Sequence, residues 1–310
     1  MGGRSWLATY LGLAVIWGLS FALIKQGLTA LTPIQVTACR MGFGALAVVV
    51  VLAVTGGLPR PTFSEWRTLA VLGIVGLAVP FALIAFAETR VTSILAGLLN
   101  AATPLFTAIF VSLMIPTERP RRIQVVGLVL GFIGIGVLIG AWDLSGTGVD
   151  PVGVLAMLAA TVCYGFGVTY GRIALSDTRL AGVQLTAGQL VAGAGFLILL
   201  LPFDPGTPPG PLSATAVVSV LALGVVGTGL AMAMFWHVLR EAGATVASTV
   251  TYVIPLVSTS VGVVMLREGL IWHQIVGGLI VIGGVVLTQW PQLAGRGVAA
   301  TPDRHAAVPD

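Results

Sequence analysis

Residues 92–118 read TSILAGLLNAATPLFTAIFVSLMIPTE, an apolar run long enough to cross a membrane, with Asn100 and Pro104 near its middle. Residues 244–268 read ATVASTVTYVIPLVSTSVGVVMLRE and repeat the pattern, with Pro255 near the middle and glutamate at the end. The two prolines are 151 positions apart. Other identical residues recur at spacings of 150 or 151: Gly73 and Gly224, Gly76 and Gly227, Glu118 and Glu268, Gln124 and Gln274, Gly127 and Gly277, Gly134 and Gly284. We infer that the chain is an internal duplication.

The composition is that of a membrane protein. Hydrophobic residues make up 57% of the chain and charged residues 8%, with a mean hydropathy of +1.04, whereas soluble domains carry about 25% charged residues. The net charge is +4, but the basic residues are scattered singly, so we expect no nucleic-acid partner. Cys39 and Cys163 both fall in apolar runs, which predicts no disulfide, no metal site and no cofactor.

The charged, Pro-rich and Gly-rich interruptions divide the chain into ten spans of membrane-crossing length. We place them near residues 5–24, 34–54, 68–87, 93–115, 124–141, 153–171, 183–201, 214–237, 244–266 and 271–289. The predicted fold is an all-α integral membrane protein of ten transmembrane helices. Five spans per repeat is an odd number, so the second repeat enters the membrane in the opposite sense, as in many transporters. We therefore expect inverted repeats over 1–141 and 142–290, and a disordered cytoplasmic tail over 291–310.

The distribution of Lys and Arg predicts the orientation, because cytoplasmic loops carry the excess. One set of connections holds three basic residues, Lys25, Arg90 and Arg267. The other set and the termini hold eleven: Arg4, Arg60, Arg67, Arg119, Arg121, Arg122, Arg172, Arg179, Arg240, Arg296 and Arg304. Both termini are therefore expected in the cytoplasm.

Pro104 and Pro255 are the candidate kink and gating residues. A proline in mid-membrane removes a helical hydrogen bond, and the freed carbonyl must be satisfied by protein or by water in a cavity. Kinks are common in ordinary membrane helices, which is the alternative. Two prolines in register across an inverted repeat favour a shared role in shaping a cavity.

Trp17 and Tyr164 are candidate aromatic walls of that cavity. Each precedes a glycine, Gly18 or Gly165, and the two positions are 147 apart. Packing against lipid or membership of an interfacial aromatic belt is the alternative. We favour a site because both residues lie past mid-helix, away from the ends where belt residues sit.

Polar residues inside spans complete the predicted substrate site, because such residues face protein or water. Helix-to-helix hydrogen bonding is the alternative for each. Arg40, about two turns into the second span, is expected to extend its charge towards the outer surface. The candidates are Asn100, its repeat partner Thr251, and also Ser248 and Tyr252.

No Asp or Glu falls in the middle of a predicted span. A membrane carboxylate is the usual device for proton coupling or for attracting organic cations, so its absence argues against a cationic-drug antiporter. A cavity with at most one arginine also suits multiply charged phosphates poorly. We therefore expect neutral or zwitterionic substrates and transport driven mainly by the substrate gradient.

The fifth and tenth spans are rich in glycine, and small residues at such spacing let helices approach closely. The default interpretation is packing between the two repeats. A homodimer through these spans is the alternative to a monomer. The glycines are Gly127, Gly131, Gly134, Gly136 and Gly140 in the fifth span and Gly277, Gly278, Gly283 and Gly284 in the tenth.

Together these features resemble the drug/metabolite transporter superfamily, in its EamA-type branch, over nearly the whole chain up to about residue 289. The resemblance rests on WGLSF at 17–21 followed by Pro33 and Arg40, on the prolines and glutamates of the fourth and ninth spans, and on the glycine-rich spans. It implies a small-solute permease of the inner membrane, often an exporter of amino acids. The chain departs from symmetry where Leu180 and Ala187 replace Pro33 and Arg40.

The leading hypothesis is a secondary transporter that exports small metabolites, amino acids first, by alternating access. A facilitative permease for another small neutral metabolite is the alternative within this class. A membrane-embedded enzyme would need a Ser-His pair, a carboxylate dyad or metal ligands at membrane depth, and none is visible. A purely structural membrane subunit would leave kinked helices and buried polar groups without a use. The predicted partners are the small-molecule substrate and the lipid bilayer.

Overall fold

The computed structural model describes residues 5–58, 60–118, 120–142 and 149–294, and this part of the chain consists of helices and their connections, without strands. The predicted tail 291–310 lies outside it from residue 295 onward. The helices of the first half are α1 (Ser5–Gly27), α2 (Pro33–Val54), α3 (Phe63–Gly73), the π-helical segment η1 (Ile74–Ala78), α4 (Val79–Glu88), α5 (Ser93–Asn100), α6 (Thr103–Met114) and α7 (Arg122–Ile139).

The second half has a similar order of elements, with an extra short segment and one helix fewer after the π-helical segment. Its elements are α8 (Pro151–Ala174), α9 (Gly182–Leu200), the short η2 (Leu201–Phe203), α10 (Ala214–Gly224), the π-helical η3 (Val225–Leu230), α11 (Ala231–Ser248), α12 (Val250–Val264) and α13 (Trp272–Ala294).

Nine helical runs within the described ranges are long and apolar enough to cross a membrane, and α12 is a shorter apolar helix. The predicted spans thus correspond to helices, with one correction at 214–237 and 244–266. There α11 continues to Ser248, so the helical break falls at Thr249 and not between residues 237 and 244. The sequence 238–248 holds no proline, so every residue in it can take part in a helix interior.

Several helix starts are fixed by side-chain caps. The Thr32 hydroxyl accepts from Gln35 N while the Gln35 side chain accepts from Thr32 N, and the same box recurs at Thr62 and Glu65. Thr92 caps α5 by accepting from Leu95 N. These caps satisfy amide groups that the lipid could not.

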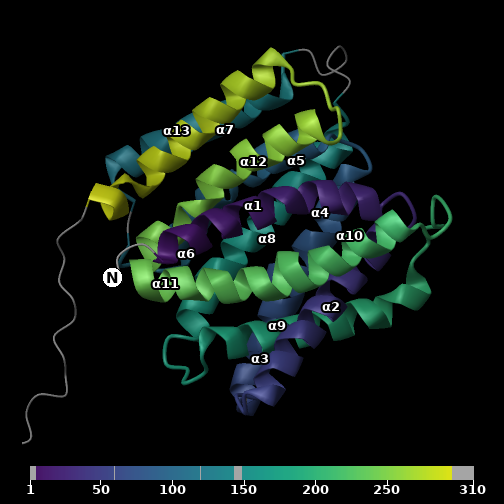
Figure 1. Ribbon diagram of the computed structural model, residues 1–310. Coiled ribbons are helices and arrows are strands. Elements are labelled where there is room, and N and C mark those ends of the chain that lie inside the picture. Colours follow the sequence, from purple (N-terminus) through teal and green to yellow (C-terminus); the bar gives the residue numbers. More distant parts are fainter. Residues whose placement is uncertain (1–4, 59, 119, 143–148, 295–310) are drawn as a thin grey trace, which may run out of the picture.

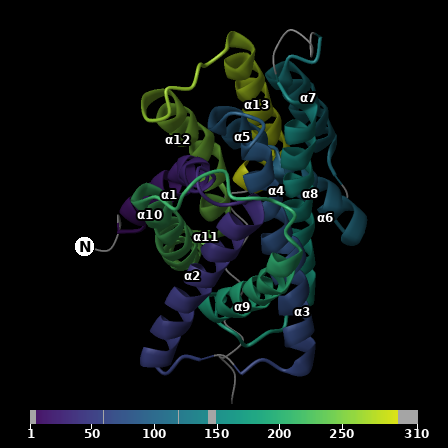
Figure 2. The same ribbon diagram turned by 90° about the vertical axis from the view of Figure 1, so that its right-hand side faces the viewer.

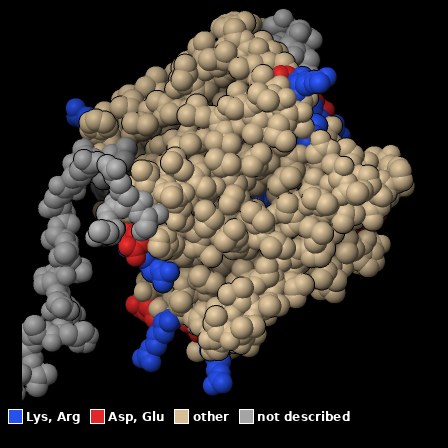
Figure 3. Space-filling model, viewed as in Figure 1, with Lys and Arg blue, Asp and Glu red and all other residues tan. Residues whose placement is uncertain are grey.

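The helices pack as a bundle with two opposite ends. In Figures 1 and 2, α7 and α13 lie side by side on one flank, α2, α3 and α9 form the opposite flank, and α1, α5, α8 and α12 lie between them. Figure 3 shows most charged side chains gathered at two opposite edges of the molecule, with a nearly uncharged belt between.

We name the two ends after Glu268 and Glu118. At the Glu268 end, Thr32 contacts Asp204, and Arg90 pairs with Asp150. The Glu118 end holds the starts of α1 and α3 and the end of α13. Contacts between connections at that end join Glu118 to Arg172, Glu65 to Thr178 and Gly57 to Gln184.

The glycines of α7 and α13 bring these two helices into backbone contact. A Cβ at Gly127 would lie 2.6 Å from Gly284 O, and one at Gly277 would lie 2.3 Å from Leu138 N. A methyl group at these positions would therefore collide with the partner backbone. These glycines pack the fifth predicted span against the tenth within one chain, as the default interpretation expected. Gly136 and Gly283 face open space.

Candidate functional site

The fourth predicted span is a broken helix. Helix α5 ends at Asn100, Ala101 and Ala102 form a turn, and Pro104 lies in the first turn of α6. A proline in a first turn costs no hydrogen bond, because that amide has no helical partner. The Asn100 Oδ1 atom is buried and has no hydrogen-bond partner within the described ranges. The break thus presents an unused acceptor at membrane depth.

The ninth predicted span is interrupted differently. Pro255 lies inside α12, which continues on both sides of it, and the interruption falls six residues earlier, at Thr249. The Thr249 hydroxyl lies 3.0 Å from the Tyr10 hydroxyl of α1. The two prolines therefore occupy matched sequence positions but different places in their helices.

Two π-helical segments, which the sequence analysis did not foresee, lie in the third and eighth predicted spans. Segments η1 and η3 begin 151 residues apart, the same spacing as the matched prolines. Single π turns inside α-helices often mark functional sites. The matched glycines Gly73 and Gly224 directly precede them: a Cβ at Gly73 would lie 2.2 Å from Gln189 O, and one at Gly224 would lie 2.9 Å from Arg40 O. The matched glycines were the feature of the sequence that could have indicated these segments.

Trp17 and Tyr164 each join two of the hydrophobic clusters of the core. Trp17 packs on the large cluster around α5 and on the small one around Leu13, with its ring 5.8 Å from that of Phe235. Tyr164 packs on the large cluster and on the one around α2 and α9, with its ring 6.3 Å from that of Phe81. The two predicted aromatic residues therefore occupy comparable positions between packing units.

The glycine beside each aromatic residue has a packing role. A Cβ at Gly18 would lie 2.5 Å from Val257 Cβ, and one at Gly165 would lie 2.8 Å from Thr107 N. Gly18 thus lets α1 approach α12, and Gly165 lets α8 approach α6. The repeated aromatic–glycine pair holds each aromatic ring next to an interrupted span.

Arg40 does not extend to the surface, and this expectation was wrong. Its side chain is 7% exposed, and its Nε donates to the Thr228 hydroxyl of η3 over 3.0 Å. The guanidinium carbon lies 3.7 Å from the centroid of the Phe81 ring. The π segment and the aromatic ring together supply contacts that stabilise the buried cation. Arg40, Phe81 and Tyr164 therefore form one group.

The remaining predicted site residues are placed as follows. The Tyr252 hydroxyl donates to the Gln289 side chain of α13, so this tyrosine faces the tenth predicted span. Thr251 is half-buried in the first turn of α12. The side chain of Ser248 lies outside the described part of the structure.

Glu88 is a buried carboxyl group that the sequence analysis overlooked. It is the last residue of α4, directly after the predicted span 68–87, and it is 0% exposed. Its Oε2 accepts from the Ser93 hydroxyl over 3.0 Å, and its Oε1 has no partner among the described residues. The charges of Lys25, Glu268 and Arg40 interact electrostatically with the Glu88 carboxyl group. A charge count along the spans missed it because it stands at a span boundary.

Two hollows of the structure lie away from the predicted site residues. One of about 120 Å³ lies at the Glu268 end and is lined by Arg90, Thr92, Val149 and Gln274 among others. Another faces outward between α7 and α13 beside Trp290. Within the described ranges, no group of three or more His, Cys, Asp or Glu side chains is arranged to hold a metal ion.

Curated proteins resemble the chain over most of its length. Protein PecM of Dickeya dadantii is 27% identical over 88% of this chain and 89% of that protein. The uncharacterized inner membrane transporter YedA of Escherichia coli is 28% identical over 81% and 79%. A probable terminal-alkyne amino-acid exporter of Streptantibioticus cattleyicolor is 25% identical over 94% and 95%.

A solved crystal structure shares the fold, with a TM-score of 0.64 and 24% identity over 94% of this chain and 99% of the other. The model of the EamA-like transporter family matches twice, at residues 4–140 and 151–290. With its apolar helices, the protein is a multi-pass membrane protein. As the sequence resemblance implied, the chain belongs to the EamA-like transporter family, within the drug/metabolite transporter superfamily.

Proposed function

We propose that the protein is a secondary transporter that exports small neutral or zwitterionic metabolites, amino acids above all, by alternating access. The observation that carries the proposal is the irregular backbone at membrane depth: the π segments η1 and η3 and the break between α5 and α6. Non-helical backbone in lipid is tolerated where it is buried in protein or lines a cavity, and transporters use such helices at their sites.

Amino acids are the favoured substrates for two reasons. One relative over nearly the full length is named a probable amino-acid exporter. The candidate site combines aromatic rings with few polar groups, Asn100 and Arg40 among them, which suits a small solute with a polar end and an apolar end. Trp17 and Tyr164 form its aromatic walls, and Ser248, Thr251 and Tyr252 complete the proposed set.

The two family matches, and π segments at matched positions, support two repeats over 1–141 and 142–290. We place the repeats in inverted orientation, so that Pro104 and Pro255 lie in gates at opposite ends of the site. The excess of Arg in the connections of the Glu118 end supports an orientation in which that end and both termini lie on the cytoplasmic side of a bacterial-type inner membrane.

Counterflow in proteoliposomes tests the proposal. Liposomes are loaded with one unlabelled amino acid at a time, and the same amino acid is added outside in labelled form. The labelled amino acid should accumulate inside transiently although no ion gradient is imposed. Accumulation of other neutral metabolites but of no amino acid would favour the alternative permease. A protein that moves none of the panel would contradict the transport proposal.

The variants Trp17→Ala and Tyr164→Ala sharpen the test. Aromatic contacts with a ligand contribute about 0.5–2 kcal/mol, so each variant should transport several-fold more slowly. Trp290→Ala is the matched control, because that ring is 52% exposed on α13. Unchanged kinetics in both site variants would remove these residues from the site.

A further inference from the structure

Arg40 is a buried cation that forms no ion pair among the described residues, although the Glu88 carboxyl group acts on its charge from a longer distance. Its Nε is used by Thr228, and within the described ranges neither Nη atom has a hydrogen-bond partner. The ion pairs of the described chain are Arg90 with Asp150 and Arg172 with Glu118, so no carboxylate pairs with Arg40. Four of its five N–H groups are therefore unused.

The unused N–H groups are not sealed in the core. The buried side-chain atoms without a partner are Glu88 Oε1 and Asn100 Oδ1, and the Arg40 nitrogens are not among them. The Nη atoms thus keep some accessible surface, although the residue as a whole is 7% exposed. The guanidinium is held at Nε by Thr228 and on one face by Phe81, so the unused N–H groups are those of the Nη1 and Nη2 edge.

A guanidinium in such a position favours an anionic ligand. Arginine remains charged in proteins, and a charge removed from water is costly unless it is paired. Two parallel N–H groups match the two oxygens of a carboxylate. The site holds a single guanidinium, and the Lys25 ammonium is already bound to backbone carbonyls, so a singly charged carboxylate fits better than a phosphate.

We propose that Arg40 recognises the carboxylate of the transported metabolite, with Nη1 and Nη2 donating to its two oxygens, Thr228 positioning the guanidinium, and Phe81 and Tyr164 packing beside it. This inference rests on the proposed transport function and specifies its substrate class as metabolites with one carboxylate. Ala187 occupies the matched position of the second repeat, so the transporter has one such contact and not two.

The test compares amino acids with their amides, which have the same side chain and amine but no carboxylate. Phenylalanine and phenylalaninamide, then leucine and leucinamide, serve as competitors of counterflow by the full-length protein. We expect the wild type to prefer each acid by about tenfold or more, as expected for a bidentate charged contact. Arg40→Met should remove this preference and leave competition by the amide unchanged.

Two further variants keep the test decisive. Arg40→Lys keeps the charge but loses the fork, and should lower the preference several-fold even if Arg40→Met does not fold. Thr228→Val should lower it partially, because Thr228 only positions the guanidinium. Arg90→Met is the matched control, since Arg90 lies in an exposed ion pair at the Glu268 end.

The outcomes separate this inference from the transport proposal. A wild type that transports the acids but treats acid and amide alike overturns the role of Arg40 and leaves the function standing. The same conclusion follows if Arg40→Lys keeps the full preference. A wild type that moves none of the acids overturns both.

Discussion

The two ends of the molecule use matched side chains in different ways. At the Glu118 end, Arg172 and Glu118 pair with each other, with one contact of 3.0 Å, and their side chains are 56% and 39% exposed. Their counterparts in the repeat are Lys25 and Glu268, which do not pair. Glu268 accepts from the backbone N–H groups at the start of α5, while Lys25 donates to the backbone carbonyl of Glu88 over 2.6 Å.

The difference shows how the same charges can hold an end of the bundle loosely or firmly. An exposed ion pair contributes about 0–1 kcal/mol, whereas charged groups that bind helix ends satisfy amides and carbonyls that would otherwise be orphaned. At the Glu268 end, α5 also packs closely on α12, since a Cβ at Gly97 would lie 2.2 Å from Ser258 Oγ. In the proposed cycle, this form is shut at the Glu268 end.

The largest expected effect comes from removing the two matched carboxylates one at a time. Glu268→Ala leaves the N–H groups of Ser93 and Ile94 without their acceptors, which are 2.9 Å and 3.0 Å away. The loss should be about 2–4 kcal/mol of unfolding free energy. Glu118→Ala removes only the exposed pair and should cost less than about 1 kcal/mol.

Chemical unfolding of both variants in detergent measures this comparison. Equal losses at the two ends would contradict the distinction between a half-buried cap and an exposed pair. Glu268→Gln separates charge from geometry, because its amide oxygen can still accept one of the two N–H groups. It should fall between wild type and Glu268→Ala.

A smaller effect is expected from Gly97→Ala, which adds a methyl group between α5 and α12. The Cβ would also lie 2.8 Å from Ser258 Cβ, so the helices must separate at the Glu268 end. Overpacking of this kind costs about 1–3 kcal/mol. Gly136→Ala is the control, because nothing lies within 4 Å of its Cβ position.

Stability and labelling together decide the outcome for Gly97. If the shut end depends on this contact, Gly97→Ala should increase reaction of a cysteine placed at Ser258 with a water-soluble thiol reagent. The native Cys39 and Cys163 would first be replaced by serine. Unchanged stability and labelling would show that the close approach of α5 and α12 is not what keeps this end shut.

The periodic features of the fold were predictable from the sequence. Long apolar runs bounded by charges gave the helices, because lipid requires internally bonded backbone over a fixed length. The glycines of α7 and α13 were predictable for the same kind of reason, since close backbone contact admits no side chain there. Contacts between residues far apart in the sequence were not needed to predict these features.

The features that depend on the burial of a side chain or on the local backbone conformation were not predictable. Burial of Arg40 results from Phe81 and Thr228, which are far away in sequence, so its position in the span alone suggested a wrong orientation. Glu88 was missed because a span boundary is uncertain by a residue or more. The π segments result from a local change in helical winding, and the matched glycines before them mark the place without specifying that change. The different states of Glu118 and Glu268 are invisible because the residues are identical.

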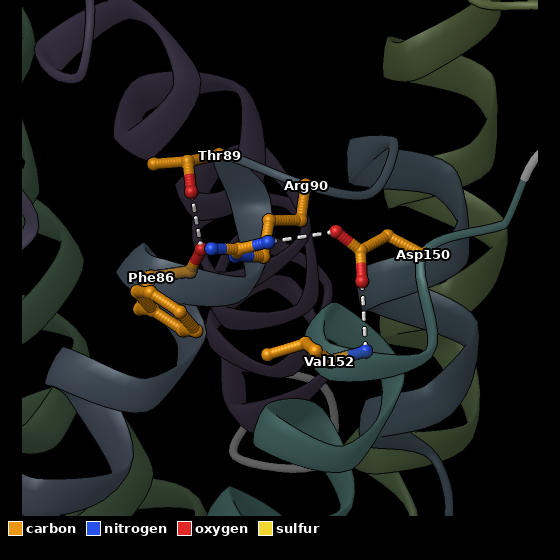
Figure 4. A network of polar contacts seen from close by, with 5 residues as sticks. All are labelled: Phe86, Thr89, Arg90, Asp150 and Val152. Carbon is orange, nitrogen blue, oxygen red and sulfur yellow. Dashed lines mark hydrogen bonds and ion pairs between the residues drawn. The ribbon is translucent and has the colours of Figure 1, made fainter.

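The smallest expected effect concerns the exposed ion pair at the Glu268 end, which tests whether exposure or location sets the strength of a contact. Arg90 donates to Asp150 over 2.8 Å, and the other Asp150 oxygen caps α8 by accepting from Val152 N (Figure 4). The Arg90 side chain, followed by this backbone amide, lowers the pKa of Asp150 below its ordinary value of 3.8. The pair therefore stabilises the folded protein above that value, and its contribution is lost as the pH falls through the lower folded pKa.

Asp150→Asn keeps a capping oxygen but loses the charge, so it should unfold slightly more easily than wild type near neutral pH and equally easily in strong acid. Thermal unfolding in detergent across the acid range measures this. A gap between the two proteins that persists below the folded pKa would mean that Asp150 acts through packing or capping and not through its charge.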